Sequence, residues 1–140
     1  MTYASGTEAV SMNLKASTTV AGAGYILTND STNNTVDLSA ATEVGVFISA
    51  DESSRDSAGE LETSDATVSA YPLGGVLLVA TTASQTYTTG LTVYVGANGL
   101  ATITAGSNKK LGLYVGSGVT TSSSAGETLI PVATAGAAIA

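Results

Sequence analysis

The chain of 140 residues contains no cysteine, no histidine and no tryptophan. Without cysteine it can form neither a disulfide nor a thiolate metal site. Without histidine it lacks the commonest general base and the commonest metal ligand. Serine is abundant, but there is no histidine to activate it, and no phosphate-binding loop is present. The sequence therefore predicts a protein that is not an enzyme, with no catalytic residue, no metal ligand and no cofactor.

Basic residues are also scarce, with four Lys and Arg against eleven Asp and Glu and a formal net charge of −7. This balance argues against nucleic acid and against anionic membranes as partners, because both attract Lys and Arg. No apolar run is long enough to be a membrane-spanning helix. Residues 1–17 show neither the basic nor the apolar region of a secretory signal, so we expect a protein made in a cytoplasm.

Large apolar side chains are few, since Val, Ile, Leu and Phe together account for 31 of the 140 residues. A chain of this length is expected to form a single domain, and its core must be thin. A thin core suggests that neighbouring subunits bury part of the apolar surface. We divide the domain into an N-terminal arm with the first strand, a first half, a second half and a tail, at residues 1–14, 15–70, 71–134 and 135–140.

Strand-forming residues alternate with turn residues about every ten positions, and helix signals are weak. This pattern predicts an all-β fold, a small β-barrel or β-sandwich with few or no helices. In "VYVGANGLATIT" the Asn98-Gly99 pair predicts a tight hairpin, and Pro131 predicts an edge strand or a bulge. The expected strands are Glu8–Leu14, Tyr25–Asn29, Thr35–Leu38, Val44–Ser49, Thr67–Tyr71, Gly75–Thr81, Thr92–Val95, Ala101–Thr104, Leu111–Val115 and Thr128–Ala133.

The chain resembles itself at an offset of 67 residues. Between residues 16–67 and 83–134 there are eleven identities without a gap, where about five are expected from this composition. "VGVFI" aligns with "LGLYV", and "SAGE" occurs at the same place in both copies. This predicts an internal duplication with equivalent bends at Gly45 and Gly112. The repeat-defining structural residues are Gly45, Phe47, Gly59, Gly112, Tyr114 and Gly126.

Two charged segments have alternative interpretations. The acidic run 51–65 holds six carboxylates and one base, Arg55, and it is either a calcium site or a solvated loop. A carboxylate pair for glycoside hydrolysis is a further alternative, although the chain offers few aromatic platforms for a sugar. Lys109 and Lys110 are either exposed charges or a contact with an acidic partner surface.

The order of the motifs is similar to that of the small capsid decoration, or cement, proteins of tailed phages and related viruses. The resemblance rests on "TTGLTVYVGANGLATIT", then "KKLGLYVGSG", then "SSAGETLIPVAT". The first half repeats it more loosely as "VAGAGYILTND", "TEVGVFISA" and "SAGELETSDATVSA". It covers residues 6–134, and the segments 51–65 and 29–34 are local elaborations of the pattern.

This resemblance implies a homotrimer on the outer surface of a virion, clamping neighbouring subunits of the major capsid protein without catalysis. It also implies an N-terminal arm, about Thr2 to Met12, that reaches the capsid through Thr2, Tyr3, Ala4, Ser5, Gly6 and Thr7. Two other functions remain open. One is a subunit of a surface, tail-fibre or pilus-like assembly, and the other is a small carbohydrate-binding domain.

Overall fold

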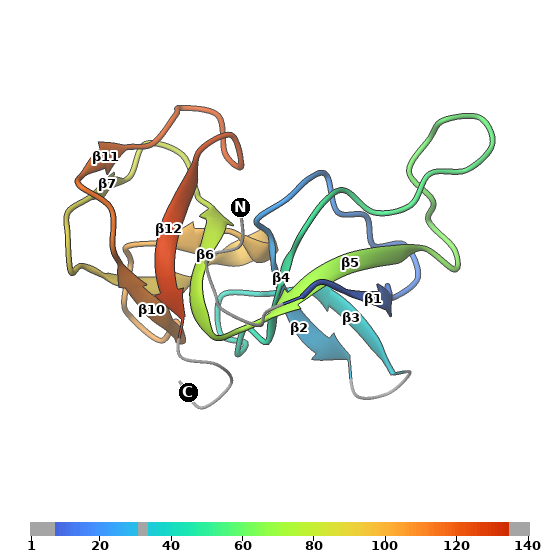
Figure 1. Cartoon of the computed structure of the whole chain (residues 1–140), viewed down its shortest axis with the longest axis horizontal. Helices are drawn as coiled ribbons and strands as arrows, with labels where there is room; N and C mark the ends of the chain where they lie inside the picture. The colour runs from blue at the N-terminus through green and yellow to red at the C-terminus, as the bar shows by residue number, and fades with distance from the viewer. Residues whose placement is uncertain (1–7, 31–33, 135–140) are drawn as a thin grey trace.

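The computed structural model describes residues 8–30 and 34–134, and these residues form two antiparallel sheets that lie side by side (Figure 1). The first sheet has the order β1-β5-β4-β2-β3 and contains the first half of the chain. Buried and exposed residues alternate along most of β5, as expected of a strand with one face in the core. The strands are β1 (Val10–Asn13), β2 (Ile26–Asp30), β3 (Thr35–Leu38), β4 (Phe47–Ser49) and β5 (Thr67–Pro72).

The second sheet has the order β6-β12-β10-β8-β9 and contains the second half of the chain. The 3-10 turn η1 (Ala97–Gly99) joins two of its strands, and a two-stranded ribbon, β11-β7, lies beside it. The strands are β6 (Gly75–Ala80), β7 (Thr86–Tyr87), β8 (Thr92–Val95), β9 (Ala101–Thr102), β10 (Lys110–Tyr114), β11 (Val119–Thr120) and β12 (Leu129–Thr134). The described chain is therefore all-β, as the sequence predicts.

Each sheet curls until its first and last strands meet. Just after β1, Leu14 forms a parallel bridge to Val36 of β3. Just after β6, Thr81 forms a parallel bridge to Ala101 of β9. The two sheets thus share one strand order and one mode of closure. The internal duplication itself stays a prediction, since shared topology also arises between unrelated sheets.

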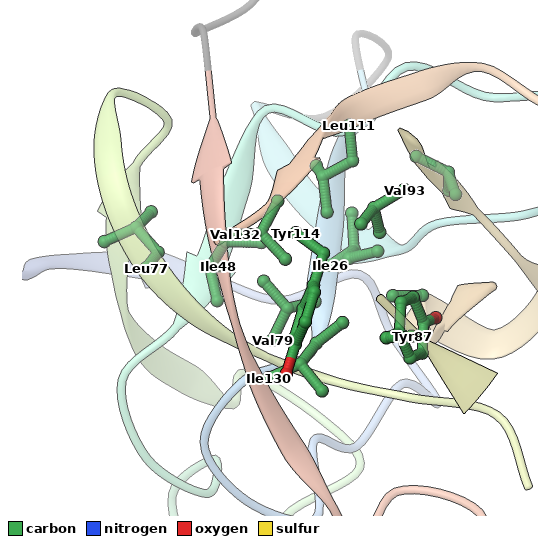
Figure 2. Packing of buried hydrophobic residues seen from close by; sticks show 12 residues of the cluster. Ile26, Ile48, Leu77, Val79, Tyr87, Val93, Leu111, Tyr114, Ile130 and Val132 are labelled. Atoms are coloured by element: carbon green, nitrogen blue, oxygen red, sulfur yellow. The ribbon is translucent and has the colours of Figure 1, made fainter. Parts of the chain in front are cut away.

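Two apolar clusters fill the fold. The first sheet encloses a cluster of Leu14, Val20, Leu27, Val36, Ala66, Val68 and Ala70. The second cluster is larger and contains Val79, Val93, Ile130 and Val132 together with both buried tyrosines. Ile26 and Ile48 come from the first sheet and yet pack among these side chains (Figure 2). The second cluster therefore joins the two sheets into one packed unit.

The hairpin predicted at Asn98-Gly99 is confirmed. Asn98 has φ +57° and Gly99 has φ +72°, the positive angles that Asn and Gly tolerate best. The turn also connects the two halves, because the Gly99 N–H donates to the carbonyl of Ser39 at 2.8 Å. A side chain at position 99 would collide with the Ile26 carbonyl. The glycine thus provides both the turn and the close approach.

The prediction for Pro131 needs correction, because β12 is an interior strand between β6 and β10. The carbonyl of Pro131 accepts the Val115 N–H at 3.1 Å, so its backbone faces the β10 side. The last paired residue of β10 is Tyr114, opposite Val132. Pro131 therefore lies opposite the first residue after β10, where its missing N–H removes only a terminal bond of the ladder.

Candidate functional site

The acidic loop, residues 51–65, connects β4 to β5 and projects away from the sheets (Figure 1). Its single basic residue, Arg55, holds the loop together by hydrogen bonds. Arg55 donates to both carboxylate oxygens of Glu52, at 2.6 and 3.2 Å, and to the carbonyl of Gly59. The hydrogen bond and the charge of Glu52 raise the pKa of Arg55. The loop is thus folded by its own side chains.

The carboxylate of Asp56 shapes the tip of this loop. One of its oxygens accepts the backbone N–H groups of Ala58 and Glu60, at 2.9 and 3.0 Å. Arg55 and Leu61 form an isolated antiparallel bridge below the tip. In the described parts of the chain, no three carboxylates gather as a metal site would require. Asp56 therefore serves the turn, as Asp commonly does in loops.

Both "SAGE" segments form turns with a glycine at positive φ, +84° at Gly59 and +82° at Gly126. Gly59 lies at the loop tip with open space around its α-carbon. Gly126 is packed. Its N–H donates to the backbone carbonyl of Thr81 at 2.8 Å, and a side chain at this position would collide with the Tyr25 hydroxyl. The second copy leads into β12 within three residues, whereas the first lies eight residues before β5.

Gly45 and Gly112 both permit close packing, but against different neighbours. Gly112 lies within β10 beside a register shift, where a side chain would collide with the carbonyl of Ala133. Gly45 precedes β4, and a β-carbon there would lie 2.6 Å from a methyl group of Ile26.

The strand pairing aligns these glycines differently from the repeat. Phe47 pairs with Leu27 and Pro72, and Gly112 pairs with the corresponding Val93 and Thr134. The pairing therefore aligns Gly112 with Phe47, two positions away from the alignment with Gly45 that the repeat spacing predicts. The register shift in β10 also turns the neighbouring Leu111 into the core.

The aromatic residues of the repeat are packing residues. Phe47 is half-buried against the first cluster. Tyr114 is buried in the second, with its ring centroid 5.5 Å from that of Tyr87 (Figure 2). The Tyr114 hydroxyl accepts the Gly118 N–H at 3.0 Å. The Tyr87 hydroxyl is buried without a partner among the described residues, and burial raises its pKa. This orphaned group lies within the packed core, so it does not form a binding site.

Surface hollows on the described chain are open and mostly lined by small polar residues. The larger is bounded by Ser17–Thr19, residues 37–40, and Ala97 and Asn98, with no aromatic side chain. A smaller one lies beside Tyr94 and Lys110. Neither Lys109 nor Lys110 forms an ion pair with the described residues. The predicted arm residues Thr2–Thr7 lie outside the described ranges.

Charge is divided unevenly between the two halves. Residues 1–70 carry ten acidic and two basic side chains, a formal charge of −8. Residues 71–140 carry Glu127, Lys109 and Lys110, a formal charge of +1. A strongly acidic half thus stands beside a nearly neutral half. Such a difference in charge between the two halves orients the protein when it approaches other charged surfaces.

An apolar surface covers the outside of the second sheet. Two rows of side chains cross strands β6, β12 and β10 on the side that faces away from the core. We call these residues the outer face: Val76, Leu78, Leu113, Val115, Pro131 and Ala133. Antiparallel sheets that face water on one side normally show polar residues there. The outer face is therefore a candidate binding surface.

This surface was not predicted from the sequence, although the sequence contains a signal for it. Strands β6 and β12 read "GVLLVA" and "LIPVAT", so their apolar residues are nearly continuous where a half-exposed strand alternates with polar ones. A continuous run predicts a strand covered on both sides. In the described chain one of these sides has no cover.

Comparison of the sequence with protein-family models gives no match, and comparison with curated proteins gives no significant match. Among the described residues, no helix is long and apolar enough to span a membrane.

Proposed function

We propose that this chain is a structural protein of a virion that binds the outer surface of a viral capsid as a homotrimer. It stabilises the shell by clamping neighbouring subunits of the major capsid protein. The proposal assigns it no reaction and no cofactor, and its partners are its own copies and the capsid protein.

The observation that carries this proposal is the position of the three motifs that resemble the decoration proteins. The first, residues 88–104, contains β8, η1 and β9, and the second, residues 109–118, contains β10. The third, residues 123–134, ends in β12. These strands are consecutive neighbours in the second sheet, in the order β9-β8-β10-β12. Motifs that resemble one family thus build one continuous part of the fold.

The physical character of the surface supports the same function. A clamp needs wide contact areas more than a deep pocket, and the hollows of the described chain are open and shallow. Several weak contacts around a symmetry axis combine into strong binding when all of them engage together. An oligomer with exposed apolar surface and a mostly acidic exterior suits attachment to a large repeating surface.

The test uses expanded capsids of the parent virus from which this protein has been removed. We expect the purified chain to co-sediment with them, to raise the temperature at which the shells disrupt, and to give trimeric density at three-fold positions in cryo-electron microscopy. Unexpanded shells of the same capsid protein serve as the matched control and should bind less. Absence of binding to expanded shells, or density on a tail or fibre instead, would refute the proposal.

A further inference from the structure

At one pair of positions, the outer face is apolar where the equivalent residues of the first sheet are polar. Leu14 and Thr81 form the closing bridges of the two sheets, and they give a common reference point. Ser11 in β1 lies three residues before Leu14, and Leu78 in β6 lies three residues before Thr81. Ser11 pairs with Ser69, whereas Leu78 pairs with Pro131.

One strand arrangement therefore accommodates either serine or large apolar residues at this pair of positions. The two serines belong to a sheet that folds with the same order and the same closure. Folding therefore does not require apolar side chains at this pair. At the positions equivalent to Leu113 and Ala133 the first sheet also has apolar residues, Ile48 and Tyr71, but the second sheet covers them, whereas Leu113 and Ala133 have no such cover among the described residues.

The side chains of the outer face are open to solvent. Leu113 is 48% exposed, Val115 46% and Leu78 36%. They lie in adjacent rows, because Leu113 pairs with Ala133 and Val115 is bonded to Pro131, the partner of Leu78. Leu129, 38% exposed, extends the apolar surface at the start of β12. Contiguous apolar surface of this kind marks an interaction site, because covering it removes the area from water.

The distribution of charge selects another copy of the chain as the partner. The outer face holds no charged side chain, and it belongs to the half with a formal charge of +1. Copies that meet through this face keep their −8 halves apart, which minimises repulsion between like-charged molecules. A basic partner would instead be drawn toward the acidic half.

The charged residues nearest the ends of the outer face are complementary between copies. Lys110 begins β10, and Glu127 lies two residues before β12. These two strands are antiparallel, so the two charges stand at opposite ends of the face. Lys110 forms no ion pair with the described residues of its own chain. A neighbouring copy can therefore present its Glu127 to this lysine.

We propose that the outer face of β6, β12 and β10 is the surface through which copies of this chain associate. This inference rests on the oligomer of the proposed function and names its interface. It does not depend on capsid binding.

The first test compares two aspartates introduced at equally exposed apolar positions. Leu113 is 48% exposed on the outer face, and Val10 is 49% exposed on the first sheet. We expect the unmodified chain to be an oligomer by light scattering across a concentration series. Leu113→Asp should raise the dissociation constant at least about tenfold, because an unpartnered carboxylate in an interface costs more than about 1.4 kcal/mol. Val10→Asp should leave the mass unchanged.

Three results would overturn the inference. They are a monomeric unmodified chain at all concentrations, an oligomer unaffected by Leu113→Asp, and an equal loss with Val10→Asp. Circular dichroism confirms that each variant is folded, and Leu113→Ser provides a milder replacement if the aspartate variant does not fold.

A second test uses the absence of cysteine from the chain. Single cysteines are placed by Leu113→Cys and Val10→Cys, and each protein is treated with a short bis-maleimide. Leu113→Cys should give a high yield of covalently linked copies, and Val10→Cys only the yield of random collisions. Equal yields would contradict the interface.

Capsid binding separates this inference from the proposed function. An oligomer that dissociates on Leu113→Asp but never binds expanded shells supports the interface and refutes the capsid function. A monomer that binds shells, and loses binding on Leu113→Asp, assigns the face to the capsid and overturns the inference.

Discussion

The first and second sheets follow the same strand order and close through the same kind of parallel bridge, but their surfaces differ. The first presents Ser11 and Ser69 outward and carries a projecting acidic loop. The second presents an apolar outer face with one lysine pair near its end. The comparison teaches that one strand order tolerates different outward residues: serine at Ser11 and Ser69, apolar residues that the other sheet covers at Ile48 and Tyr71, and exposed apolar residues on the outer face.

The largest expected effect separates the two glycines of the repeat. Gly112→Ala places a methyl group against the backbone carbonyl of Ala133, which cannot move without breaking the ladder. We expect it to lower the free energy of unfolding by about 3 kcal/mol or more. Gly45→Ala meets the side chain of Ile26 instead, and should cost about 1–2 kcal/mol. Urea unfolding of both variants measures the difference, and equal losses would contradict the distinct environments.

A smaller effect distinguishes the two "SAGE" turns. Gly126→Ala adds a collision with the Tyr25 hydroxyl to the strain of a positive φ, and should cost about 2 kcal/mol. Gly59→Ala has open space and carries only the backbone strain, about 1 kcal/mol. Thermal unfolding of the pair checks this order. A greater loss at Gly59 would show that the loop tip contributes more to stability than its contacts indicate.

The third comparison concerns the tyrosines, because the two that are buried among the described residues, Tyr87 and Tyr114, both lie in the second cluster. Tyr114→Phe removes the acceptor of the Gly118 N–H and should cost about 1 kcal/mol. Tyr87→Phe removes an unpartnered buried hydroxyl, so stability at pH 7 should be unchanged or slightly greater.

Alkaline pH sharpens the same comparison. Burial raises the pKa of Tyr87 in the folded chain above its unfolded value of about 10. Below pH 10 both states keep the proton, and above it the unfolded state releases the proton first. The folded chain should therefore lose up to about 1.4 kcal/mol of stability per pH unit above 10 from this residue. Denaturant unfolding at pH 9–11 should show a shallower decline for Tyr87→Phe, and identical pH profiles would contradict this.

The smallest expected effect on stability converts the first sheet toward the second. Ser69→Leu places an apolar side chain on the outside of β5, where Ser69 is exposed. We expect the free energy of unfolding to change by less than about 0.5 kcal/mol. Light scattering should instead detect increased association, since the variant exposes new apolar surface. A large loss of stability would mean that the outward position is not free.

The sequence predicted each of the ten longer or better-patterned strands at or near its observed position, and the hairpin at Asn98-Gly99 was correct at the level of its positive φ angles. The strands β7 and β11 were missed because two residues each are too short to show a period. Pro131 was misassigned because its role depends on where the neighbouring strand β10 ends. The end of β10 is set by pairing between distant segments, and no local sequence pattern indicates where it lies.

The candidate binding surface shows the same limit. The nearly continuous apolar runs in β6 and β12 were visible in the sequence, but they are equally typical of strands covered on both sides. Placing Leu113 beside Ala133, and Leu78 beside Pro131, required the register of three strands.

By itself the sequence determined the all-β class, the turn positions and the separation of charge, because these depend on residue type and local spacing. Only the tertiary structure decided that β12 is interior, that Gly112 aligns with Phe47, and that six apolar side chains gather on one open face. The physical reason is that strand pairing joins residues far apart in the chain, and a shift of one residue would turn each side chain to the opposite side of the sheet.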